Sequence, residues 1–251
     1  MKQYKLIILF LFTILFVSCS SDDGKISFTI LQLNDVYEIS SIQGGKYGGM
    51  ARVETVHQEL VAKNKNTLLV MAGDFLNPSL LGTMKHEGVR VRGKQMIEVM
   101  NAMSFDLVAF GNHEFDIPKK DLQKRMDESN FPWISSNVFN KTADSIKQFY
   151  QELSGVKRLI KGSFIKEIFD EDGTKIKVGF ISVCIPSNPK DYVLYKDMFS
   201  SIVKEYESIK NKVDIVIGLT HVKIEHDREI AKLLPNIPLI MGGHEHTNKN
   251  E

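Results

Sequence analysis

The chain has 251 residues, which is long enough for one large domain with a sizeable hydrophobic core. Its 32 basic and 31 acidic residues nearly balance, so charge gives no reason to expect nucleic acid binding. The two cysteines are Cys19 near the start and Cys184 inside an apolar run, and this arrangement argues against a disulfide framework.

Residues 1–18 have the features of a secretory signal peptide. Lys2 and Lys5 precede an apolar run, and small residues follow it. The run is shorter than the roughly 20 residues that a transmembrane helix needs. We therefore expect this segment to be removed and the protein to leave the cytoplasm.

Cys19 ends a Phe-Val-Ser-Cys run that resembles a bacterial lipobox. The resemblance predicts a lipid on Cys19, a polar tether over residues 19–25 and a folded domain over residues 26–251. The exported protein would then be a lipoprotein that faces the periplasm or the cell surface and touches the membrane only through this lipid. An ordinary cleaved signal with an incidental cysteine is the alternative.

Strand-like and helix-like segments alternate along the rest of the chain, which indicates an α/β fold. Apolar runs predict strands at residues 25–33, 67–72, 106–110, 131–136, 159–168, 175–184, 213–219 and 238–241. Apolar residues at helical spacing predict helices at residues 50–64, 93–103, 119–128, 198–212 and 224–234. Turn residues predict a loop at 76–88 and a hairpin turn at 170–173, whereas 140–155 is polar and its structure stays open.

Five of the predicted strands end in residues of the kind that bind metals. Ligands in open α/β sheets bind beyond the carboxyl ends of the strands, so these side chains are expected to meet. Carboxylate, carboxamide and imidazole groups suit Zn, Mn, Fe or Co, and the absence of thiolates argues against a structural zinc cluster. The candidate ligands are Asp35, Asp74, Asn112, His221, His244 and His246.

The densest of these strand ends is residues 111–116, Gly-Asn-His-Glu-Phe-Asp. Asp116 follows His113 by three residues, so its carboxylate can return to the imidazole and fix its tautomer. Asn112 is a candidate ligand for a metal, and Glu114 is expected to be structural. Taken alone, the segment could also be a polar turn in which an Asp caps the next helix.

Together these motifs closely resemble the calcineurin-like metallophosphoesterase superfamily, and within it the catalytic domain of the secreted 5′-nucleotidase/UDP-sugar hydrolase family. The resemblance covers residues 26–247. It implies a four-layer α/β/β/α sandwich and hydrolysis of phosphate esters, with 5′-nucleotides or related nucleotides as small-molecule substrates. The motifs that carry it are Asn34-Asp35-Val36-Tyr37, Gly73-Asp74, residues 111–116, Thr220-His221 and Gly243-His244-Glu245-His246.

The resemblance also implies two divalent metal ions, with Zn, Mn, Co or Mg as candidates. It implies one ion held by Asp35, Asp74 and His246, and another held by Asp74, Asn112, His221 and His244, so that Asp74 bridges the two. A metal-bound hydroxide would attack phosphorus. His113 and Asp116 would form the catalytic dyad, and Asn112 and His113 would bind the substrate.

Tyr37 is a departure from the pattern, because most relatives have a His ligand at this position. A neutral phenol is a poor ligand, and its pKa near 10 must fall before it coordinates as phenolate. The first metal site is therefore expected to be weaker, to be completed by water, or to prefer a harder ion such as Mn or Mg.

Members of this family usually continue beyond the point that corresponds to Glu251, with further strands and a second domain that grips the nucleoside. We therefore expect the sandwich to be incomplete at its C-terminal end and the strand at 238–241 to expose an edge. A second chain is a candidate source of the missing domain. The alternative function is a metal-binding but inactive or partner-dependent fragment of such an enzyme, and a purely structural lipoprotein is the least favoured interpretation.

Overall fold

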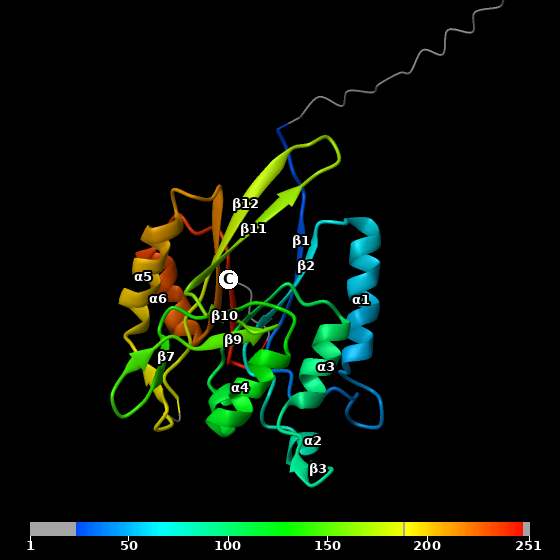
Figure 1. Ribbon diagram of the computed structural model, residues 1–251. Coiled ribbons are helices and arrows are strands. Elements are labelled where there is room, and N and C mark those ends of the chain that lie inside the picture. The colour runs from blue at the N-terminus through cyan, green and yellow to red at the C-terminus, as the bar shows by residue number, and fades with distance from the viewer. Residues whose placement is uncertain (1–23, 188, 248–251) are drawn as a thin grey trace, which may run out of the picture.

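The computed structural model describes residues 24–187 and 189–247 (Figure 1). The predicted signal peptide and the predicted lipid attachment at Cys19 lie outside the described residues. Among the described residues, no helix combines the length and the apolar character that crossing a membrane requires.

The first sheet contains four parallel strands in the order β1-β2-β5-β6. Strand β2 is buried along its whole length, as its uninterrupted apolar sequence predicts. Helices connect successive strands, and Figure 1 shows α1 and α3 beside this sheet on its outer side. The elements are β1 (Thr29–Leu33), α1 (Met50–Lys63), β2 (Thr67–Ala72), α3 (Lys94–Ala102), β5 (Leu107–Ala109), α4 (Lys119–Glu128) and β6 (Trp133–Ile134).

The second sheet has the order β11-β12-β14-β15. Strands β11 and β12 form the antiparallel hairpin predicted from the turn at 170–173, and the other neighbours are parallel. Helices α5 and α6 cover the outer face of this sheet (Figure 1). The elements are β11 (Ser163–Phe169), β12 (Lys175–Ile181), α5 (Met198–Ile209), β14 (Ile215–His221), α6 (Ile224–Leu233) and β15 (Ile240–Gly243).

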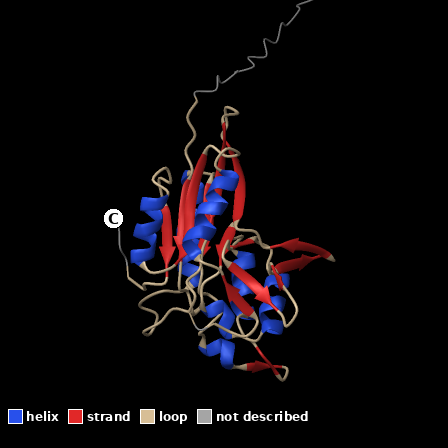
Figure 2. Ribbon diagram, turned by 90° about the vertical axis from the view of Figure 1, so that its left-hand side faces the viewer, coloured by secondary structure: helices blue, strands red, loops and turns tan. Residues whose placement is uncertain are grey.

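The two sheets pack face to face around a common apolar core. Val70 of β2, Phe180 of β12 and Leu219 of β14 are buried together in this core. Separate buried clusters join each sheet to its outer helices. This arrangement confirms the expected four-layer α/β/β/α sandwich, whose long strands run side by side through the molecule (Figure 2).

Several short elements outside the sandwich were not predicted. The segment expected to be a loop contains a short helix and a hairpin, and the polar segment contains short strands. These elements are short, and their mostly exposed or half-exposed residues give neither helical nor alternating apolar periodicity. The predicted strand at 159–168 is divided in two. These elements are α2 (Leu80–Thr83), β3 (Lys85–His86), β4 (Val89–Arg90), β7 (Val138–Lys141), β8 (Ile146–Lys147), β9 (Tyr150–Leu153), β10 (Val156–Leu159) and β13 (Val193–Tyr195).

The parallel register places the strand ends at one level. Ala72 pairs with Ala109 in the first sheet, and His221 pairs with Gly243 in the second. The residues that follow these positions therefore meet at the same end of the sandwich. Within the described residues β15 is the last strand of its sheet, which agrees with the expected exposed edge.

Candidate metal centre

Asp74 lies at the centre of the site, in the turn that follows β2. It is fully buried and has a positive φ of 59°. A Cβ on the preceding Gly73, whose φ is also positive, would lie 2.5 Å from the amide nitrogen of Gly111, so only glycine allows the two strand ends to approach. Asp74 Oδ1 accepts the backbone N–H of His113 at 2.8 Å.

Three atoms that can accept a hydrogen bond lie close together here: His221 Nε2, Asp74 Oδ2 and Asn112 Oδ1. His221 Nδ1 donates to the carbonyl of Ala72 at 2.7 Å, so the neutral ring carries its proton there. His221 Nε2 then faces Asp74 Oδ2 at 3.1 Å and Asn112 Oδ1 at 3.2 Å. Acceptor atoms at this distance require a positive charge between them, supplied either by a second proton or by a metal ion.

The side chains around Asp74 also fit the ligand requirements of a divalent metal ion. Asp74, His221 and His244 each offer a ligand atom, and these atoms all lie within 4.8 Å of one another. The bond from His221 Nδ1 to a backbone carbonyl is the type of interaction that orients metal-binding histidines. Carboxylate, carboxamide and imidazole ligands fit Zn, Mn or Co.

The pKa of His221 is raised by its position beside the carboxylate of Asp74. Burial disfavours the imidazolium, but the hydrogen bond and charge of Asp74 outweigh burial and raise the pKa of His221 from 6.5 to about 9. Because the folded-state pKa is the higher one, the stabilisation is fully present below pH 6.5 and is lost as pH rises toward 9.

We therefore expect the metal-free protein to lose stability between pH 6.5 and pH 9, by an amount on the order of 3 kcal/mol. Urea unfolding of EDTA-treated protein at several pH values measures the slope of the unfolding free energy against pH. The His221→Asn variant is the control and should lack the slope. Equal slopes in the two proteins would contradict the assignment.

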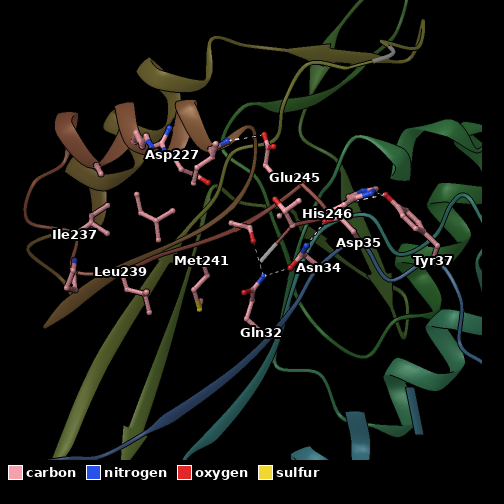
Figure 3. Close-up of a pocket in the computed structure, with 18 residues that line it drawn as sticks. Gln32, Asn34, Asp35, Tyr37, Asp227, Ile237, Leu239, Met241, Glu245 and His246 are labelled. Atoms are coloured by element: carbon pink, nitrogen blue, oxygen red, sulfur yellow. Dashed lines mark hydrogen bonds and ion pairs between the residues drawn. The ribbon is translucent and has the colours of Figure 1, made fainter. Parts of the chain in front are cut away.

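Asp35, Tyr37 and His246 form a second group beside the first. Asp35 Oδ2 accepts from Asn34 Nδ2 at 2.6 Å and from the backbone N–H of His244 at 2.9 Å. Asp35 Oδ1 lies 3.0 Å from His246 Nε2 and 3.2 Å from the Tyr37 hydroxyl. Burial and the neighbouring carboxylates raise the pKa of Tyr37 well above its ordinary value, so the phenol is neutral. Figure 3 shows the three side chains pointing toward one another.

His113 and Asp116 form the predicted pair. The distance from His113 Nδ1 to Asp116 Oδ2 is 2.6 Å, so the imidazole donates from Nδ1 and keeps Nε2 for another partner. Lys190 Nζ lies 3.3 Å from the other carboxylate oxygen. Lys190 was not predicted, because no spacing rule connects positions 116 and 190.

Glu114 is structural, as the sequence indicated, and the structure shows how: it binds backbone amides of two separate turns. Its fully buried carboxylate accepts four backbone N–H groups, from Asp74 at 2.8 Å, Phe75 at 2.8 Å, Leu76 at 3.2 Å and Gly111 at 2.7 Å. One side chain therefore joins the turns that follow β2 and β5.

The structure thus brings all the predicted site residues to one end of the sandwich. Beside them an open cavity of about 890 Å³ runs from Tyr37 and Asp35 along β15 to α6 (Figure 3). A volume of this order is typical of small-molecule sites. A four-layer α/β sandwich with clustered carboxylate and imidazole groups at its strand ends has the architecture of a metal-dependent hydrolase.

The family model described as calcineurin-like phosphoesterase matches residues 28–248, and the chain belongs to this family of phosphoric ester hydrolases. Membership implies divalent metal ions. The chain is 30% identical to the snake venom 5′-nucleotidase of Crotalus adamanteus in an alignment 244 residues long, which covers 89% of this chain and 38% of that protein. It is 30% identical to the 5′-nucleotidase of Homo sapiens in an alignment 240 residues long, which covers 89% of this chain and 39% of that protein. The chain therefore spans about two fifths of the length of these relatives.

Solved structures show the same fold. The 5′-nucleotidase precursor of Thermus thermophilus superimposes with a TM-score of 0.70 at 24% identity, covering 89% of this chain and 43% of that chain. The calcineurin-like phosphoesterase YfkN of Bacillus subtilis gives a TM-score of 0.67 at 24% identity, covering 88% of this chain and 72% of that chain.

Proposed function

We propose that this chain hydrolyses phosphate monoesters, with 5′-nucleotides as the substrate class. The observation that carries the proposal is the position of the His113–Asp116 pair beside the acceptor cluster, because the His113 backbone N–H bonds directly to Asp74. Ester hydrolysis needs an acid or base next to a site of positive charge. The 5′-nucleotidases among the relatives support the choice of substrate.

In this proposal Asp74, Asn112, His221 and His244 hold a divalent metal ion. Such an ion, when bound, lowers the pKa of water and neutralises charge on the phosphoryl group. Asn112 directs its carboxamide oxygen toward His221, which leaves its amide nitrogen as a donor for a phosphoryl oxygen.

His113 is the proposed acid of the reaction. Asp116 accepts a hydrogen bond from the Nδ1–H and holds the ring, so that a proton on Nε2 can pass to the oxygen of the departing alcohol. Lys190 keeps the second oxygen of Asp116 occupied. These contacts fix the orientation of the imidazole before substrate binds.

We also propose that the protein is exported and attached to the membrane by a lipid on Cys19. The pattern of residues 1–19 supports export and the lipid, and the venom origin of one relative supports export alone.

The test of the proposed function is hydrolysis of AMP and p-nitrophenyl phosphate by the purified full chain, with Mn, Zn, Co or Mg added after EDTA treatment. We expect turnover that requires an added metal. Metal binding without turnover of either ester would instead support a partner-dependent or inactive metal-binding protein.

His113→Ala is expected to lower kcat for AMP by about 10²–10⁴-fold, the usual contribution of a positioned acid or base. The loss with p-nitrophenyl phosphate should be smaller, because p-nitrophenolate leaves without a proton. Steady-state kinetics with both esters measure the difference. His86→Ala, at an exposed position in β3, is the matched control and should retain activity. Equal losses with both esters would contradict the role of His113 as an acid.

A further inference from the structure

The hydroxyl of Tyr37 lies among the three side chains implied as ligands of the first metal ion. Its oxygen is 3.0 Å from His246 Nε2, 3.2 Å from Asp35 Oδ1 and 3.4 Å from Asp74 Oδ2. An ion here would lie about 2.0–2.2 Å from each of these atoms. It must therefore either accept the phenol oxygen as a ligand or displace the ring.

The hydrogen bonds of this group are satisfied without an ion. A carboxylate only accepts hydrogen bonds, so the contact of 3.0 Å with Asp35 Oδ1 requires a proton on His246 Nε2. The hydroxyl proton of Tyr37 points toward carboxylate oxygens of Asp35 and Asp74. The protons on His246 Nε2 and on the Tyr37 hydroxyl therefore occupy the space between the carboxylates that the first ion would fill.

The group around His221 differs from this one. His221 Nε2 lies 3.1 Å from Asp74 Oδ2 and 3.2 Å from Asn112 Oδ1, and the Nδ1 proton of the ring is already donated to the carbonyl of Ala72. His221 and Asp74 are fully buried, so water reaches them poorly. A divalent ion can therefore replace the second proton of His221 without displacing a side chain, whereas an ion at the first position meets the phenol of Tyr37.

We infer that Tyr37 closes the first metal position, so that this chain binds one divalent ion at Asp74, Asn112, His221 and His244 in place of the two that its family resemblance implies. The residues around Asp35 then serve as a hydrogen-bonded wall of the site. The inference rests on the proposed ligand roles. It is independent of the proposed hydrolysis, because a count of bound ions does not require turnover.

The test is the number of Mn²⁺ ions per chain after EDTA treatment and equilibrium dialysis, measured by elemental analysis. The wild-type chain and Tyr37→Phe should each bind one ion, and Tyr37→His should bind two. Electron paramagnetic resonance gives a second readout, since two neighbouring Mn²⁺ ions show spin coupling and an isolated ion does not. Two coupled ions in the wild-type chain, or one ion in Tyr37→His, would overturn the inference.

Asp35→Asn keeps the test informative if Tyr37→His does not fold. In the wild-type background this change should leave the count at one ion, because Asp35 holds none. In the Tyr37→His background it should return the count from two to one. A wild-type chain that loses its ion on Asp35→Asn would place the ion at the first position and refute the inference, whatever the hydrolysis assay shows.

Discussion

Asp74→Asn is expected to abolish metal-dependent hydrolysis, with a loss of about a thousandfold or more. The substitution keeps the size of the side chain and an oxygen that can accept the His113 N–H. It removes the negative charge that faces His221 Nε2. Metal ions contribute several kcal/mol of charge stabilisation in such reactions, and about 4 kcal/mol corresponds to a thousandfold in rate.

The measurement is kcat/KM for AMP at saturating Mn²⁺, together with the number of ions bound. Asp144→Asn, at an exposed loop position, is the control and should behave as the wild-type chain. A variant that loses its ion yet retains at least a tenth of the activity would show that hydrolysis does not depend on this centre.

Glu114→Gln is expected to cause the largest loss of stability among conservative single changes at the site. Each carboxylate oxygen accepts two backbone N–H groups, so an amide nitrogen in place of either oxygen leaves two buried donors without an acceptor. An unsatisfied buried donor costs about 1–3 kcal/mol, which gives a loss of about 2–6 kcal/mol. That is a large fraction of the roughly 5–15 kcal/mol that stabilises a typical domain.

Urea unfolding of the metal-free proteins measures this effect without a contribution from ion binding. The control is Glu59→Gln, an exposed position on α1, where the same chemical change should cost less than about 0.5 kcal/mol. If Glu114→Gln proves as stable as the control, the four hydrogen bonds do not hold the two turns together.

The main strands and the side chains that follow them could be placed from the sequence alone. Strand β2 begins and ends as predicted, at Thr67 and Ala72, because a fully buried parallel strand is apolar without interruption. The hairpin between β11 and β12 followed from its turn residues. Asp74 and His221 were candidate ligands because polar residues at parallel strand ends meet at one edge.

The apolar periodicity of the sequence did not predict the short elements outside the sandwich. Strands β7 and β9 are short, and most of their residues are half-exposed, so neither alternates clearly between apolar and polar positions. Their structure depends on partners far along the chain, such as β13 for β7. Periodicity within a segment carries no information about such partners.

The types of side chain at the candidate site were likewise evident from the sequence, but the hydrogen bonds that each side chain makes were not. Tyr37 was recognised as a departure, yet only the fold shows its hydroxyl between Asp35, Asp74 and His246. Glu114 was expected to be structural, yet its four amide donors come from two turns almost forty residues apart. Residue types and strand ends are local properties of the chain. Hydrogen-bond partners are decided by the tertiary structure, because a donor and its acceptor meet only after both sheets have packed.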